Sequence, residues 1–146
     1  MIYFDAAYIA KCYLNEPGAE RVREVAHEAD GLGSCELARI EFASILKRHV
    51  RERNITRREM STVLREFEED EGNGVWHWYA ITSALIEKAR QSVLQVPSTV
   101  FIRSGDALHL TCAEENGFRE VYTNDRHMLA AARHFRLKGV DVVGEP

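Results

Sequence analysis

The chain has 146 residues, of which 45% are hydrophobic and 29% charged, a balance typical of one globular domain and not of a disordered or fibrous chain. The formal net charge of −4 excludes nucleic-acid binding through an overall positive charge, so any such role depends on a local basic surface or a bound metal. Because no apolar run approaches the ~18 residues of a membrane span and no signal peptide is visible, we expect a single cytoplasmic domain over residues 1–146, without a membrane partner.

The first part of the chain predicts two short strands separated by two helices. Residues 2–4 form an apolar run typical of a strand, and residues 6–14 have the composition of a helix. A second helix is expected to hold Pro17 in its first turn, where proline is tolerated, and to end near Gly31. Residues 32–35 are then expected to form the next short strand.

The middle of the chain predicts two longer helices followed by a strand. Apolar residues recur at the helical period over residues 36–53. Thr56 and Glu59 have the spacing of a capping box, which predicts that another helix begins there and ends before the Gly-Asn-Gly turn at residues 72–74. The aromatic segment at residues 75–81 favours a strand.

The last part of the chain continues the alternation of helices and strands. Helices are predicted over residues 82–94, before Pro97, and over residues 103–115, where Asn116 and Gly117 form the cap. The remaining segments are a strand, a helix and a last strand, at residues 120–123, 126–135 and 140–143. This alternation favours a parallel sheet flanked by helices, a fold class whose functional sites lie beyond the carboxyl ends of the strands.

Two aspartates occupy that position in the predicted sheet. Asp5 directly follows the apolar run at residues 2–4, and Asp125 follows the predicted strand at residues 120–123 in a similar way. Each is a candidate site residue at a strand end. The alternative for either residue alone is an ordinary helix N-cap, a position that aspartate favours.

Two further acids lie within predicted helices. Glu41 has Leu37 and Ile45 four residues away on either side, so its carboxylate is expected to face the interior and to need a partner. The alternative is a structural ion pair or an edge position. Asp106 precedes Leu110 by one turn on an apolar-looking face, and its alternative is a first-turn aspartate stabilised by the helix dipole.

Taken together, the four acids have the chemistry of a Mg²⁺ or Mn²⁺ site. Hard cations bind oxygen ligands, and they remove the repulsion that gathered carboxylates otherwise exert on one another. One or two such ions can activate a water and stabilise the in-line displacement at a phosphate. The three cysteines include no CxxC pair, which argues against zinc.

With these residues the sequence resembles the PIN-domain family, and within it the VapC toxin ribonucleases of type II toxin–antitoxin pairs. The resemblance spans nearly the whole chain in the family order, and no single motif is specific without the others. The matching segments are Tyr3-Phe4-Asp5-Ala6-Ala7, Ala38-Arg39-Ile40-Glu41-Phe42-Ala43, Ser104-Gly105-Asp106-Ala107-Leu108-His109-Leu110 and Val121-Tyr122-Thr123-Asn124-Asp125.

The resemblance implies a three-layer α/β/α sandwich with a short parallel sheet, and metal-dependent cleavage of RNA. Asp5, Asp106 and Asp125 would bind Mg²⁺ or Mn²⁺, and Glu41 would bind a second ion or orient the attacking water. In-line attack would leave a 5′-phosphate and a 3′-hydroxyl. Thr123 matches a residue that supports the site, whereas Ala7 replaces a common serine or threonine, so one secondary hydrogen bond is in doubt.

The resemblance also implies partners. Such toxins form homodimers and are inhibited by a cognate VapB-type antitoxin, which lays a helix in an apolar groove and sends a basic side chain into the acidic pocket. The first helices are expected to contribute to that groove through Ile9, Tyr13 and Leu14.

Two other functions are compatible with parts of the sequence. The first is a catalytically inactive PIN-type module that binds RNA or protein, although the presence of all four acids argues against it. The second is a receiver domain with an aspartate phosphoacceptor. That alternative is weakened because the first strand ends in a single acid, Asp5, and because Lys138 is poorly placed.

Several remaining residues have two interpretations each. His109 follows Asp106 by about one helical turn, and simple packing is favoured over contact with the site. Trp76 and Trp78 share one face of a strand, where packing is favoured over base stacking. A basic cluster at a helix junction either contacts RNA phosphates or is a solvated surface; it consists of Lys47, Arg48, Arg51, Arg53, Arg57 and Arg58.

Overall fold

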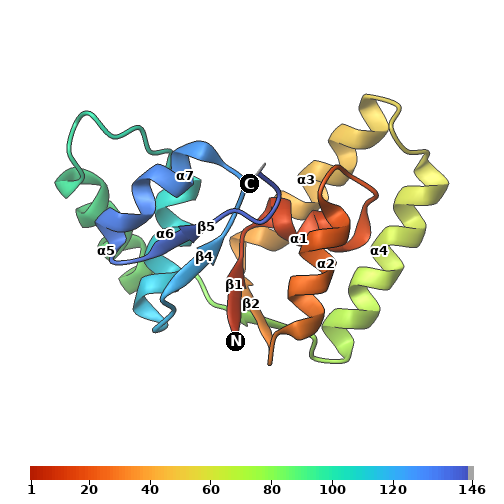
Figure 1. Ribbon diagram of the computed structural model, residues 1–146, viewed down its shortest axis with the longest axis horizontal. Coiled ribbons are helices and arrows are strands. Elements are labelled where there is room, and N and C mark those ends of the chain that lie inside the picture. Colours follow the sequence, from red (N-terminus) through yellow and green to blue (C-terminus); the bar gives the residue numbers. More distant parts are fainter. Residues whose placement is uncertain (145–146) are drawn as a thin grey trace.

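Five short strands form one sheet, with β1 in the middle, in the computed structural model of the chain, which describes residues 1–144 (Figure 1). The strand order is β3-β2-β1-β4-β5, and each neighbouring pair is parallel. The register places Tyr3 of β1 beside Gly33 of β2 and Val121 of β4. The strands are β1 (Ile2–Phe4), β2 (Leu32–Cys35), β3 (Trp76–Tyr79), β4 (Glu120–Tyr122) and β5 (Lys138–Val140).

Helices cover both faces of the sheet, so the predicted three-layer α/β/α fold is confirmed. In Figure 1, α5, α6 and α7 lie on one side of the sheet and α1 to α4 on the other. Within residues 1–144 the helices are α1 (Ala6–Tyr13), α2 (Ala19–Glu28), α3 (Leu37–Arg51), α4 (Arg57–Gly72), α5 (Ser83–Gln95), α6 (Ser104–Glu115), α7 (Arg126–Ala131) and the 3₁₀ helix η1 (Ala132–Phe135).

The alternation of side chains along β1 explains why there are two cores. Successive residues of a strand point to opposite faces. Tyr3 packs into a core with Leu110 of α6 and Phe135 of η1, whereas Phe4 packs into a second core with Phe42 of α3. Both β1 side chains are fully buried, which anchors the strand that leads directly to Asp5.

The predicted start of the second helix is wrong by two residues. Pro17 lies in a turn before α2, and the helix begins at Ala19. Gly18 separates them with a left-handed backbone (φ 77°), a conformation that glycine adopts readily and that interrupts the helical path.

The predicted last strand at residues 140–143 is also misplaced, because β5 begins at Lys138. Gly139 pairs with Val121 at the centre of β5 and packs closely beneath Leu129, where a side-chain Cβ would lie 2.8 Å from the Leu129 Cδ2. Glycine is therefore required at position 139, although a glycine makes a segment less recognisable as a strand from its sequence. The predicted helix at residues 126–135 divides into α7 and the tighter η1.

Ile9 on α1 and Leu14, which caps the end of that helix, do not line an open apolar groove. Ile9 is fully buried and Leu14 is 4% exposed, because both contribute to the core beneath α1. The expectation that they line an antitoxin groove is therefore wrong. Exposed apolar side chains lie instead on α5, among them Ile86 and Leu94. No helix within residues 1–144 has both the length and the apolar character to cross a bilayer.

Candidate active site

All four candidate acids line one pocket at the carboxyl ends of β1 and β4. The pocket has a volume of about 820 Å³, and α3 and α6 provide its other sides. Parallel strands place their carboxyl ends at one edge of the sheet, and β1 and β4 are neighbours, so the residues that follow them are brought together. The acids are Asp5 after β1, Glu41 on α3, Asp106 on α6 and Asp125 after β4.

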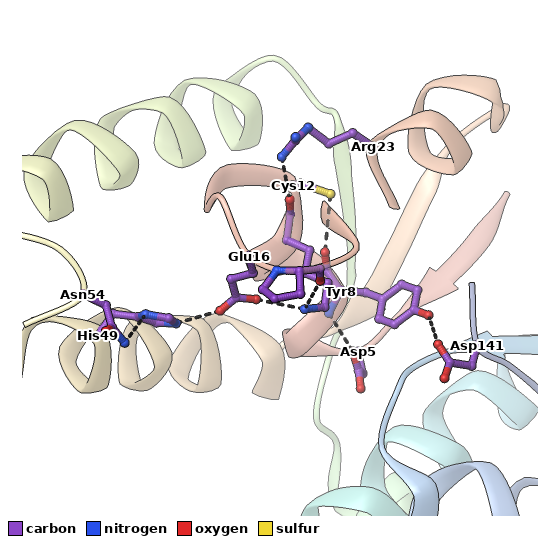
Figure 2. Close-up of polar contacts among 10 residues, drawn as sticks. Asp5, Tyr8, Cys12, Glu16, Arg23, His49, Asn54 and Asp141 are labelled. Atoms are coloured by element: carbon purple, nitrogen blue, oxygen red, sulfur yellow. Dashed lines mark hydrogen bonds and ion pairs between the residues drawn. The ribbon is translucent and has the colours of Figure 1, made fainter. Parts of the chain in front are cut away.

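Asp5 is the most deeply placed acid, and neutral donors hold its carboxylate. Its Oδ1 accepts a hydrogen bond of 2.8 Å from the Tyr8 backbone N–H, so Asp5 is also the N-cap of α1 (Figure 2). Its Oδ2 accepts a hydrogen bond of 2.5 Å from the buried Thr123 hydroxyl. Burial raises the pKa of Asp5 to about 6, although these hydrogen bonds oppose the shift.

Thr123 connects the two strand-end acids. Its Oγ1 also accepts a hydrogen bond of 3.0 Å from the Asp125 backbone N–H, so one hydroxyl contacts both residues. The Asp125 Oδ1 accepts hydrogen bonds from the backbone N–H groups of His127 and Met128, which makes Asp125 the N-cap of α7. Both strand-end acids therefore combine the cap role with a place in the pocket.

Asp106 and Asp125 share a basic neighbour, Arg103, the N-cap residue of α6. The Arg103 Nε donates to the Asp106 Oδ2 at 2.9 Å, and its Nη2 donates to the Asp106 Oδ1 at 3.3 Å. The same Nη2 also donates to the Asp125 Oδ2. Burial raises the pKa of Asp125, but the backbone N–H groups and Arg103 outweigh this effect and hold that pKa below its usual value.

Glu41 is connected to the core through a chain of hydrogen bonds. The Nε2 of His109, a residue only 2% exposed, lies 2.5 Å from the Glu41 Oε1. The His109 Nδ1 lies 2.8 Å from the Tyr3 hydroxyl, which in turn accepts a hydrogen bond from the Cys35 backbone N–H. Burial lowers the pKa of His109, but the hydrogen bond and the charge of Glu41 outweigh it and raise that pKa.

This chain of hydrogen bonds directs one N–H group of His109 at Glu41 in either protonation state. When the imidazole is neutral, the Tyr3 hydroxyl donates to Nδ1, and the ring hydrogen is on Nε2. When the imidazole is protonated, both nitrogens carry hydrogen, and Nε2 again donates to Glu41. The Glu41 Oε1 is therefore engaged by His109, and its Oε2 is the oxygen available to the pocket.

Cations of the basic cluster divide into two groups. Arg48 and Arg51, on the last turns of α3, line the pocket with the acids. Lys47, Arg53 and the arginines that begin α4 do not line it. The pocket thus combines acidic groups at the strand ends with basic groups along α3.

The donor chemistry of the pocket fits Mg²⁺ or Mn²⁺. Its four carboxylates supply the oxygen ligands that these ions prefer, and buried Asp5 receives only neutral hydrogen-bond donors. Within residues 1–144, no three acidic, histidine or cysteine side chains are already arranged around one ion position. The ion pairs from Arg103 to Asp106 and Asp125 account for the present arrangement of those two acids.

Sequence reasoning did not identify the roles of Arg103 and His109 in this pocket. Both are three residues from Asp106, on either side, and this spacing places them near one face of a helix. That spacing is the only sequence signal for Arg103, and for His109 the sequence favoured packing over contact with the site. By contrast, His127 packs on Phe101, with ring centroids 4.4 Å apart.

The two tryptophans of β3 pack as favoured from the sequence. Their rings stack with centroids 5.9 Å apart, and Trp76 is 5% exposed. The Trp76 indole N–H donates a hydrogen bond of 2.7 Å to the Tyr13 hydroxyl. These contacts place Trp76 in the core, away from the acidic pocket.

Comparisons with known proteins agree with this fold. A family model described as PIN domain matches residues 2–134. No curated protein matches the sequence closely enough to show a relative. A crystal structure of the Mycobacterium tuberculosis toxin VapC20, described as cleaving the sarcin-ricin loop, is similar in fold, with a TM-score of 0.70 over 90% of this chain and 95% of that chain at 14% sequence identity. Since the family model spans most of its length, the chain belongs to the PIN-domain family.

Proposed function

We propose that the chain is a metal-dependent endoribonuclease that acts as the toxin of a type II toxin–antitoxin pair of the VapBC kind. The observation that carries this proposal is the single pocket shared by Asp5, Glu41, Asp106 and Asp125. Membership of the PIN family and the fold likeness to a VapC toxin support it. The substrate class is RNA, and the reaction is hydrolysis of a phosphodiester bond.

In this proposal, Asp5, Asp106 and Asp125 would hold Mg²⁺ or Mn²⁺, and Glu41 would hold a second ion or orient the attacking water. Such an ion, when bound, activates water and stabilises the charge that develops at the scissile phosphate. Thr123 fixes the Asp5 carboxylate by its hydrogen bond to Oδ2.

Two groups of the chain would then position the reactants. His109 fixes the rotation of the Glu41 carboxylate, so that Oε2 faces the pocket and can accept a proton from a water. Arg48 and Arg51 supply positive charge at the wall of the pocket, which offsets the repulsion between the acids and RNA phosphates. The products would be a 5′-phosphate and a 3′-hydroxyl.

The proposal includes two protein partners. A VapB-type antitoxin would inhibit the enzyme by directing a basic side chain into the acidic pocket, where its charge replaces that of the metal. A second copy of the chain would form a homodimer. The four acids of the pocket, with the buried Asp5 among them, are what make a basic inhibitor suitable.

The decisive experiment compares Asp106→Asn with the wild-type protein in RNA cleavage with Mn²⁺. Asparagine keeps the size of the side chain and an acceptor for Arg103 but removes one ligand charge, so cleavage should fall at least about a thousandfold. Glu68→Gln is the matched control, because it removes one exposed negative charge outside the pocket and should cleave like wild type.

Cleavage-site mapping on total RNA, with and without divalent metal, would identify the target. The sarcin-ricin loop, the RNA named for VapC20, belongs among the sites inspected. Cleavage by Asp106→Asn at the wild-type rate would refute the assignment of Asp106. If the wild-type protein melts at the same temperature with and without Mn²⁺ and cleaves no RNA, the inactive PIN-type binding module replaces the nuclease.

A further inference from the structure

Arg103 contacts two acids of the pocket at once, although it is not itself an acid of the proposed metal site. Its guanidinium donates to both oxygens of Asp106 and to one oxygen of Asp125. Its backbone N–H also donates to the Asp106 Oδ2, at 3.3 Å. The carboxylate oxygens that would bind a divalent cation are thus the same atoms that accept hydrogen bonds from this side chain.

The surroundings of Arg103 allow its side chain to leave. The side chain is 54% exposed, whereas the side chains of Asp106 and Asp125 are 14% and 29% exposed. Arg103 has an extended backbone (φ −93°, ψ 159°) just before α6, so a rotation of the side chain releases both acids without moving the helix. Each acid keeps a backbone hydrogen bond when that side chain leaves, because Asp125 accepts from N–H groups of α7 and Asp106 accepts from the Arg103 backbone N–H.

We propose that Arg103 is the resident counter-ion of this pocket, and that a divalent cation binds by exchange with it. The inference rests on the proposed metal site and adds a residue that sets the affinity of that site. Without Arg103, Asp106 and Asp125 would repel one another across the pocket. With it, the metal-free pocket is neutralised in part, and part of the binding free energy of the metal is used to displace the guanidinium.

Arg48 provides an internal comparison for this proposal. It lines the same pocket and carries the same charge, but within residues 1–144 it makes no hydrogen bond or ion pair with a pocket acid. A general electrostatic effect of positive charge on metal affinity would therefore act through both arginines. An exchange at the ligand atoms acts through Arg103 alone.

The test measures Mn²⁺ binding by calorimetry in the absence of RNA, at constant ionic strength, for the full-length chain. Arg103→Gln should bind Mn²⁺ roughly tenfold more tightly than wild type, because the competing cation is gone. Arg48→Gln should bind within about twofold of wild type. Arg103→Lys keeps a charge but loses the planar fork that contacts both acids, so its affinity should lie between those of wild type and Arg103→Gln.

A thermal measurement gives a second readout. In chelator, Arg103→Gln should melt below wild type, since Asp106 and Asp125 lose their shared partner. Added Mn²⁺ should then raise its melting temperature by more than it raises that of wild type. Because Arg103 is largely exposed, its replacement is not expected to prevent folding.

The possible results separate the exchange from the metal site itself. An affinity of Arg103→Gln that equals or falls below that of wild type would overturn the exchange, as would an equal gain in Arg48→Gln. Asp106→Asn should bind Mn²⁺ much more weakly than wild type. If it binds as tightly, the metal site and the proposed function are wrong together, whatever Arg103→Gln does.

Discussion

Two clusters of charged residues at the two ends of α1 differ in how their charges are balanced. In the first, Glu16 lies between two basic side chains: its Oε2 is 3.1 Å from the Lys11 Nζ, and its Oε1 is 2.7 Å from the His49 Nε2 (Figure 2). We call these three residues the matched cluster. In the acidic pocket, by contrast, buried Asp5 accepts hydrogen bonds from neutral groups alone.

The matched cluster contains charges that stabilise the fold, whereas the acidic pocket contains charges that are available to bind another molecule. Lys11 is 6% exposed and also donates to the Pro17 carbonyl, so the matched cluster fastens the turn between α1 and α2 to the end of α3. A buried charge without an opposite charge destabilises a folded protein. Within residues 1–144 Asp5 forms no ion pair, and burial raises its pKa, so its place in the pocket agrees with a role in binding a cation.

Replacing Asp5 should produce the largest effect and should separate stability from activity. Asp5→Asn removes a proposed ligand charge, so we expect cleavage of RNA with Mn²⁺ to fall at least about a thousandfold. The same variant should be more stable than wild type in chelator near neutral pH, by about 3 kcal/mol, because the pKa of Asp5 rises from 3.8 to about 6 on folding. Urea denaturation with and without Mn²⁺ measures the stability, and a gel assay measures the cleavage.

The pH dependence of that stability difference follows from the raised pKa. The folded protein binds the Asp5 proton more tightly than the unfolded chain does, so wild type gains stability as the pH falls through about 6. The gain is complete below the unfolded pKa of 3.8, where Asp5 is protonated in both states. The advantage of Asp5→Asn should therefore be full above about pH 7 and vanish near pH 4. An advantage that is independent of pH would show that the ionised carboxylate is not its cause.

The sequence predicted the fold class and most elements, because these depend on local patterns. Apolar runs that end at an acid, the helical period of residues 36–53 and the Thr56 capping box all have direct structural counterparts. The errors arose where tertiary contacts override local preference. Gly139 belongs to β5 because Leu129 leaves no room for a side chain, and no property of the neighbouring residues indicates this.

The partners of the acids were harder to predict than the acids themselves. The sheet places β1 beside β4, and this order brings Asp5 and Asp125 together. The sequence predicts a parallel sheet but does not indicate the order of its strands. His109 meets Glu41 across a separation of 68 residues, and Tyr3 across 106 residues. A single sequence contains the helical spacing of His109 and Asp106 but does not show which of the surrounding side chains His109 contacts.

His109 supports one acid of the pocket, because it donates a hydrogen bond to Glu41. A group that positions a reacting carboxylate typically contributes 10- to 100-fold to activity. We expect His109→Leu to lower kcat by roughly that factor with KM changed less than about threefold, since RNA binding does not use the buried imidazole. His109→Gln places an amide N–H near the position of Nε2 and should retain most of the activity.

The two variants of His109 also distinguish positioning from packing. The imidazole is only 2% exposed, so a purely structural role would favour leucine over glutamine at this position. Melting temperatures measured beside the kinetics identify any loss of fold. A His109→Leu enzyme with the wild-type kcat would show that the hydrogen bond to Glu41 does not contribute to the reaction.

The matched cluster should respond in the opposite way to the acidic pocket, and with the smallest effect on activity. Glu16→Gln leaves the buried Lys11 ammonium without its carboxylate, although the Pro17 carbonyl still accepts one hydrogen bond. Because the Glu16 side chain is 18% exposed, the expected loss is about 1–2 kcal/mol in the free energy of unfolding, less than for a fully buried pair. Mn²⁺ affinity and cleavage should stay within about twofold of wild type, because the cluster does not line the pocket. Urea denaturation and calorimetry on the same preparations measure both. A loss of Mn²⁺ affinity in Glu16→Gln that matches the loss in Asp5→Asn would mean that the two clusters are coupled through α1, and the division between structural and functional charges would then fail.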